Sequence, residues 1–274
     1  MNIYKIKFHR KDWQYIKQKG VSKMDIGEIL SDSLRYPISD WSKILILGII
    51  FVIGSISSII GVFTYNSGLI SLIGIIGFII GLIGYGYLFR IIRASLAGVE
   101  ELPNFDEWLN MLIDGIKLFI VGLVYSIPAI IIVLIFAAST LLAIIANQSV
   151  SSLVTGAIIA AGIGILIAFL YMLIVIPIIA MAIANMAYND GEFGAAFRFS
   201  EILDNIARIG WGNLIIWYIV FGIIYIILAL VGSAITGIFS LINPAVSIVL
   251  MSLIVTPYLL MYIARSVALV YITE

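Results

Sequence analysis

The stretch Ile44–Phe89, ILILGIIFVIGSISSIIGVFTYNSGLISLIGIIGFIIGLIGYGYLF, contains no charged residue. A helix needs about 20 apolar residues to cross a bilayer, so this stretch is too long for one crossing and suits two. Two further uncharged stretches follow it, Leu118–Asn189 and Ile209–Ala264. We therefore expect an all-α integral membrane protein with six transmembrane helices.

Each uncharged stretch is expected to form a helical hairpin, because a short polar turn without charge lies near its middle. The hairpins are expected at about 43–89, 117–183 and 213–268. The individual crossings are expected at 43–63, 69–89, 117–146, 153–183, 213–239 and 245–268. Together they form a membrane domain over 24–270, preceded by a basic arm (1–23) and followed by a short tail (271–274).

The charged residues indicate how the hairpins are oriented. All Lys and Arg lie before Ile44, in two connectors around 90–117 and 190–208, or at Arg265. Lys and Arg mark the cytoplasmic side of membrane proteins. We therefore expect a multi-pass protein of the cell membrane that enters the bilayer from the cytoplasm, with both termini cytoplasmic.

The composition excludes several classes of protein. Hydrophobic residues make up 63% of the chain and charged residues 11%, so the bilayer must act as its solvent. Lys plus Arg equals Asp plus Glu, which gives no reason to expect nucleic-acid binding. The chain has no cysteine and one histidine, so thiolate metal sites are excluded and no cofactor or metal is expected.

The connectors indicate a threefold repeat. An acidic segment precedes each hairpin: Asp25–Asp32, Asp106–Asn110 and Ser200–Asn205. Because every hairpin has the same orientation, the repeats would be parallel. The apolar residues of Phe105–Ile116 share one helical face, which predicts an amphipathic helix at the cytoplasmic interface.

Proline and glycine mark special positions within the crossings. Pro128, Pro177 and Pro257 each remove a helix hydrogen bond, so they are candidate hinges or tolerated kinks. The second crossing is rich in glycine, and Gly77 and Gly81 form a close-packing motif. This helix is expected to pack within the chain or to mediate self-association.

The segment Gly98–Trp108, which continues to Lys117, resembles the hallmark of an archaeal and bacterial membrane family catalogued as domain of unknown function 4013. The segments Met24–Trp41 and Phe193–Phe197 also fit this family. The resemblance covers residues 24–270 and implies a topology, but it implies no activity.

The motifs give little support to an enzyme. The sequence lacks a zinc-protease motif, a serine nucleophile elbow and a phosphate-binding loop. Asp25, Glu28 and Asp32 share one helix face and could hold a divalent metal, or they could form the solvated side of an amphipathic helix. We expect a non-enzymatic protein.

Two functions fit the sequence. The crossings lack the charges that ion-coupled carriers use, so a passive route or a cavity that handles lipid or a small solute is one interpretation. The other is a structural or adaptor protein whose interfacial helices dock a partner or shape the bilayer. Membrane lipid is the expected partner in both.

The candidate binding residues lie where the hairpins end. Arg90, Arg93 and Arg265 could grip a lipid headgroup or another anion, or they could pair with acids of the chain. The cytoplasmic residues expected at the same level are Asp106, Glu107, Trp108, Asp114, Glu201 and Asp204.

Overall fold

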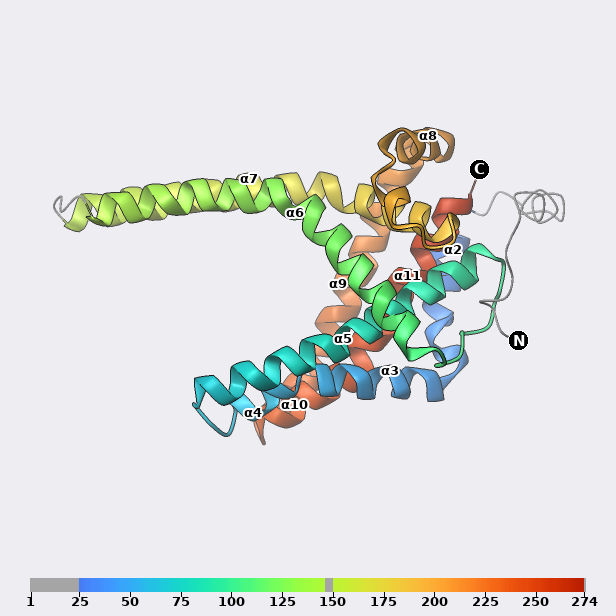
Figure 1. The fold of residues 1–274 in the computed structure, drawn as a ribbon, viewed down its shortest axis with the longest axis horizontal. Coiled ribbons are helices and arrows are strands. Elements are labelled where there is room, and N and C mark those ends of the chain that lie inside the picture. Colours follow the sequence, from blue (N-terminus) through green and yellow to red (C-terminus); the bar gives the residue numbers. More distant parts are fainter. Residues whose placement is uncertain (1–24, 146–149, 274) are drawn as a thin grey trace. The chain divides into compact units, whose positions relative to one another are not determined.

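The computed structural model describes residues 25–145 and 150–273. These residues form helices and no strand (Figure 1). The α-helices are α2 (Ile26–Arg35), α3 (Trp41–Gly54), α4 (Ile56–Gly61), α5 (Ser67–Leu96), α6 (Trp108–Ile145), α7 (Val150–Tyr188), α8 (Phe199–Ile209), α9 (Trp211–Ser240), α10 (Pro244–Leu250) and α11 (Thr256–Ile272). Two short 3-10 helices lie at Pro37–Ser39 and Phe193–Phe197, and a π-helical stretch, Met251–Val255, joins α10 to α11.

Within the described residues, five helical segments are long and apolar enough to cross a membrane. A sixth span results if Ile26–Ser39 and Trp41–Gly54, which meet at 81°, are one broken span. This supports a membrane protein with five or six crossings. The five segments are Ser67–Leu96, Trp108–Ala138, Ile159–Tyr188, Trp211–Ser240 and Pro244–Ile272.

The first crossing differs from the prediction. A single helix over 43–63 is wrong, because the helix breaks at Ser55, between α3 and α4. The break follows Gly54, and Gly/Ser pairs are a known cause of sharp kinks. The Ser55 N–H donates to the carbonyls of Phe51 and Val52, which tightens the last turn of α3.

The amphipathic helix predicted at Phe105–Ile116 is not a separate element, and its position at the membrane interface stays a prediction. Glu107 has a left-handed backbone with φ of 49°, and the helix begins only at Trp108. From there it continues without interruption as α6, so residues 108–116 form the first turns of a long helix. The acidic segments at 25–32 and 200–205, in contrast, do lie in short helices of their own, α2 and α8.

The chain divides into two compact units, and the first comprises residues 25–118 and 181–273 of the described chain. In this unit α3 packs along α5, as Figure 1 shows. The backbones approach so closely that a Cβ added at Gly77 would lie 2.7 Å from the carbonyl oxygen of Gly54. Gly86 approaches the backbone of Met111, and Gly115 approaches that of Leu82 in the same way. Glycines of the second crossing therefore serve packing within the chain.

A second close approach explains the π-helical stretch. Pro257 has no N–H to donate to the carbonyl of Leu253, four residues earlier. The helix widens there, and the Thr256 N–H donates to the carbonyl of Met251. A Cβ at Gly48 of α3 would overlap the Leu253 carbonyl, so only glycine fits against this stretch. Pro257 thus lies beside a real irregularity of the helix.

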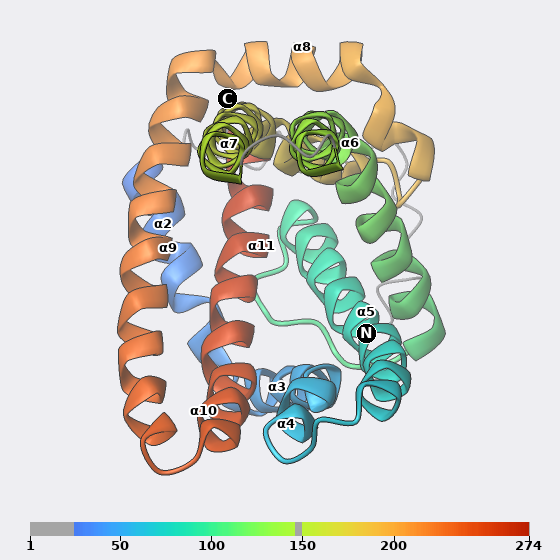
Figure 2. The same ribbon diagram turned by 90° about the vertical axis from the view of Figure 1, so that its left-hand side faces the viewer.

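The helices of the C-terminal hairpin pack through polar and aromatic contacts. α9 and α11 run side by side (Figure 2). The indole N–H of Trp217 donates to the Ser266 hydroxyl at 2.9 Å, and the rings of Phe221 and Tyr262 stack at 5.0 Å. At the turn before α10, the Asn243 side chain caps the helix and Pro244 occupies its first turn.

The second unit comprises residues 119–180, which belong to α6 and α7. These two helices lie side by side in Figures 1 and 2. The Tyr171 hydroxyl donates to the Tyr125 carbonyl at 3.0 Å, and Gly164 leaves room for Phe136. Pro128 and Pro177 lie inside continuous helices, and their role as hinges stays a prediction. The basic arm (1–23) and half of the second turn, expected at 147–152, lie outside the described residues.

Candidate ligand-binding site

Arg265 of α11 is the centre of a polar region in the first unit. Its side chain is only 5% exposed. Nε and Nη2 donate to the two carboxylate oxygens of Asp32 at 2.6 and 3.3 Å. Nη1 donates to the Ser95 hydroxyl and the Val99 carbonyl, both at 3.1 Å. One guanidinium thus joins α11 to α2, to the end of α5 and to the following connector.

Tyr36 completes the surroundings of this arginine. The Arg265 guanidinium carbon lies 4.6 Å from the centre of the Tyr36 ring, a cation–π distance. The Tyr36 hydroxyl donates to the Glu101 carbonyl at 3.3 Å. The Tyr258 hydroxyl donates to the Leu34 carbonyl at 2.9 Å and ties α2 to α11 a second time. These contacts hold α2 in a fixed position over Arg265.

A pocket of about 580 Å³ lies between this anchor and the exposed face of α2. We call it the α2 pocket. Its α2 residues are spaced at three and four positions, so they share one helix face. The opposite face buries Ile29, Leu30 and Ser33. The pocket is lined by Gly27, Glu28, Ser31, Asp32, Arg35, Tyr36, Ser39, Glu100 and Arg265.

The charges of the α2 pocket fall into two groups. Asp32 and Arg265 neutralise each other at its buried side. Glu28, Arg35 and Glu100 are exposed. Within the described residues neither Arg35 nor Glu100 forms an ion pair or a hydrogen bond through its side chain. The pocket therefore offers one cation and two carboxylates to a ligand.

The three carboxylates considered as metal ligands have other roles. Asp25 caps α2 by accepting from the N–H of Ile26 at 2.8 Å, and Glu28 accepts from the N–H of Asp25 at 3.3 Å. The two form a capping box, while Asp32 pairs with Arg265. In the part of the chain that the structure describes, no group of three His, Asp or Glu residues could hold a metal ion.

Arg90 lies outside the α2 pocket and serves the connector after α5. Its side chain is 3% exposed, and it donates to the carbonyl of Asn104 at 2.7 Å and to that of Asp106 at 2.8 Å. It also forms an ion pair with the Asp106 carboxylate. These contacts favour pairing of Arg90 with its own chain over binding of a lipid headgroup or another anion.

The other candidates of this region also contact the chain itself. Arg93 pairs with Asp190 at 3.6 Å. The Lys117 ammonium donates to the Asp114 carboxylate and to the Gly191 carbonyl, each at 3.0 Å. Asp114 is buried, whereas the Trp108 side chain is half exposed. The contacts of Asp190 and Gly191 fasten the connector 189–198 to the end of α5 and to α6.

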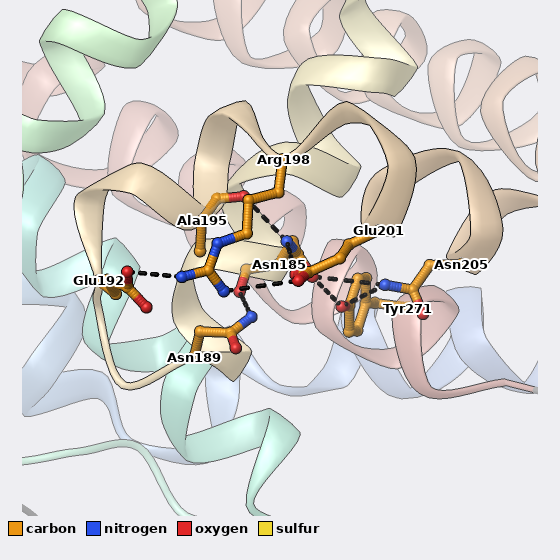
Figure 3. Close-up of polar contacts among 8 residues, drawn as sticks. All are labelled: Asn185, Asn189, Glu192, Ala195, Arg198, Glu201, Asn205 and Tyr271. Atoms are coloured by element: carbon orange, nitrogen blue, oxygen red, sulfur yellow. Dashed lines mark hydrogen bonds and ion pairs between the residues drawn. The ribbon is translucent and has the colours of Figure 1, made fainter.

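Glu201 belongs to a separate polar network around Asn185 (Figure 3). Asn185 is 2% exposed, and its amide donates to the Ala195 carbonyl at 2.9 Å and to Glu201 at 3.4 Å. Its side-chain oxygen accepts from the Tyr271 hydroxyl at 2.7 Å and from Asn205 at 3.4 Å. The network therefore joins α7, α8 and α11.

The edge of this network is an exposed ion-pair cluster. Arg198 donates to Glu192 at 2.5 Å and lies 3.6 Å from Glu201 (Figure 3). The hydrogen bond that Arg198 donates to Glu192 raises the pKa of Arg198 above its usual value. Asp204 is exposed on α8, and its side chain forms no hydrogen bond or ion pair with the described residues.

Of the three arginines singled out in the sequence, only Arg265 reaches the α2 pocket. Arg90 and Arg93 lie in α5 and contact other connectors instead. Sequence reasoning missed Arg35, whose spacing from Glu28 and Asp32 on one helix face could have indicated it. It also missed Glu100, because nothing in the sequence brings this connector to α2.

A family model described as a protein of unknown function (DUF4013) matches residues 69–237, more than half of the chain. The chain belongs to the DUF4013 family. The match includes the segments Gly98–Trp108 and Phe193–Phe197 but not α2 or α11. No curated protein and no solved structure matches this DUF4013 member. Its function must therefore be argued from its own geometry.

Proposed function

We propose that this DUF4013 member is a non-enzymatic membrane protein that binds a polar ligand in the α2 pocket. The ligand is the headgroup of a lipid or a small polar solute. In this proposal the pocket faces the cytoplasm, because the Lys and Arg residues of the chain gather on its side.

The observation that supports the proposal is the placement of charge. The long apolar spans carry no charge between residues 209 and 264, and Arg265 is the first charged residue after them. At this level the chain borders an open pocket of about 580 Å³, lined mainly by charged and hydroxyl side chains. Volumes of 300–1,000 Å³ are typical of small-molecule sites. A pocket at the end of apolar spans suits the depth of lipid headgroups.

The rigidity of the pocket also supports binding. The contacts of Arg265 with Asp32, Ser95 and Val99 hold three of its walls together before a ligand arrives. A site that is already formed loses less conformational entropy on binding.

Ligand-dependent thermal unfolding of the full-length protein in mild detergent tests the proposal. A panel of phospholipids and soluble headgroup compounds is added, and a ligand that binds only the folded protein raises Tm. Ser31→Trp places a large ring in the pocket from an exposed position and should abolish the rise. Ser200→Trp, on the exposed surface of α8, is the matched control and should keep it.

The proposal fails if no member of the panel raises Tm in the parent protein. It also fails if Ser31→Trp responds to every ligand as the parent does, because the binding site then lies elsewhere.

A further inference from the structure

We infer that the ligand of the α2 pocket is zwitterionic and carries a phosphate and a primary amine, as ethanolamine phosphate does. The inference rests on the proposed function and names the chemical class of its ligand. Arg35 binds the phosphate, and Glu28 and Glu100 bind the ammonium.

The Arg265–Asp32 pair does not take part in ligand recognition. Four hydrogen bonds of 2.6–3.3 Å to Asp32, Ser95 and Val99 use four of the five N–H groups of Arg265. The pair is neutral as a whole. It therefore forms a fixed wall, and the exposed residues of the pocket select the ligand.

The exposed charges have opposite signs and lie on two walls. Glu28 and Arg35 are seven residues apart on α2, which corresponds to a rise of about 10 Å along the helix. Glu100 comes from the connector after α5, whose path turns at Gly98 with a positive φ of 73°. A headgroup-sized ligand in this pocket therefore meets both a cation and carboxylates.

This arrangement disfavours ligands with a single sign of charge. A phosphate without an amine would face two carboxylates, and an amine without a phosphate would face Arg35. Placing like charges together lowers affinity and is a common source of specificity. Only a ligand with both charges pairs every exposed charged group of the α2 pocket.

The same chemistry is present in phosphatidylethanolamine and in free ethanolamine phosphate, so the test uses both. Thermal unfolding of the full-length protein is measured with ethanolamine phosphate, with glycerol 3-phosphate and with ethanolamine. We expect ethanolamine phosphate to bind at least tenfold more tightly than either of the others.

In nanodiscs, native mass spectrometry compares the retention of phosphatidylethanolamine and phosphatidylglycerol. If the lipid binds and free ethanolamine phosphate does not, the natural ligand is a membrane lipid. Stronger retention of phosphatidylethanolamine than of phosphatidylglycerol then supports the inference as well as binding of the soluble compound would.

Charge variants assign the two ends of the ligand. Arg35→Gln should weaken binding of ethanolamine phosphate at least tenfold and leave ethanolamine no weaker. Glu100→Gln should weaken ethanolamine phosphate and strengthen glycerol 3-phosphate. Glu28→Gln removes the other carboxylate that we expect to bind the ammonium. It keeps the capping box of α2, because Gln can replace Glu in that motif. Arg208→Gln on α8 and Glu101→Gln, next to the pocket, are matched controls and should bind like the parent.

The possible results separate the two levels of the argument. If ligands bind and Ser31→Trp blocks them, but phosphate-only or amine-only compounds bind as well as the zwitterion, the ligand class is wrong and the proposed function stands. The class is also wrong if Arg35→Gln and Glu100→Gln change all three affinities equally. If neither the soluble compounds nor the lipids bind, both ideas fail.

Discussion

At the scale of single residues, burial decides what each arginine does. Arg90 and Arg265 are nearly buried and use their planar forks to hold carbonyls and carboxylates of their own chain. Arg35 is exposed on α2 and free of such contacts with the described residues. The same side chain therefore acts as a structural clamp in two places and as a candidate ligand contact in a third.

The clamp of Arg265 predicts a loss of stability. Arg265→Gln leaves Ser95, the Val99 carbonyl and Asp32 without their donors, and each unsatisfied polar group costs about 1–3 kcal/mol when buried. We expect a total loss of about 2–4 kcal/mol in the free energy of unfolding, because Asp32 is partly exposed and can be hydrated. Denaturant unfolding in detergent measures it. Arg208→Gln, on the exposed face of α8, should lose less than 0.5 kcal/mol. An unchanged midpoint for Arg265→Gln would contradict the clamp.

The close approach at Gly48 makes a second prediction at this scale. Gly48→Ala introduces a Cβ where the Leu253 carbonyl lies, so α3 and the π-helical stretch must separate. Overpacking of this kind costs about 1–3 kcal/mol. Gly222→Ala in α9 is the control, because no atom lies within 4 Å of the added Cβ. A thermal midpoint that falls equally in both variants would show that helix contact at Gly48 is not the cause.

At the scale of elements, the network around Asn185 fixes the connector 189–198 and α8 to the bundle. Asn185→Ala removes four side-chain contacts and leaves the Tyr271 hydroxyl with one fewer acceptor. We expect amide hydrogen exchange to become faster in residues 193–209 than in α5 or α9. Asn189→Ala, which loses only a bond to the Asn185 carbonyl, is the matched control. Equal acceleration across all helices would instead indicate general destabilisation.

Local signals account for where several elements begin. Asn243 and Pro244 begin α10, and the acidic segments at 25–32 and 200–205 lie at the starts of α2 and α8. Helix caps and turns depend on a few neighbouring residues, so the sequence carries them. The start of α6 at Trp108 could not be found in this way. It depends on the stacking of Phe105 on Tyr87, at 3.8 Å, which holds the connector against α5.

The break at Ser55 and the α2 pocket needed information from distant parts of the chain. Ser55 lies beside Ser252, and their hydroxyl oxygens are 3.1 Å apart although 197 residues separate them. The α2 pocket combines α2, the connector at Glu100 and Arg265 of α11. Apolar helices with no charge offer no pattern that selects one neighbour over another. Their packing follows from glycine contacts and polar anchors that only the fold reveals.

At the scale of the whole molecule, the separation of charged connectors from uncharged turns determines the expected orientation. Tyr65 and Leu241 lie in the two described uncharged turns and are 98% and 87% exposed. Asn104 and Ser200 lie in the charged connectors and are also exposed. If Lys and Arg are retained on the cytoplasmic side, the two sets must lie on opposite sides of the membrane.

Single cysteines test this orientation directly, because the natural chain has none. Tyr65→Cys and Leu241→Cys should react with a membrane-impermeant thiol reagent added to intact cells. Asn104→Cys and Ser200→Cys should react only after the cells are opened. Their reaction in opened cells shows that each cysteine is reactive once the reagent can reach it. All four positions are exposed, so accessibility within the fold does not bias the comparison. Labelling of Asn104→Cys in intact cells would invert the topology and place the α2 pocket outside. Its ligand would then be an external solute or an outer-leaflet lipid, and the binding chemistry of Arg35, Glu28 and Glu100 would apply on that side.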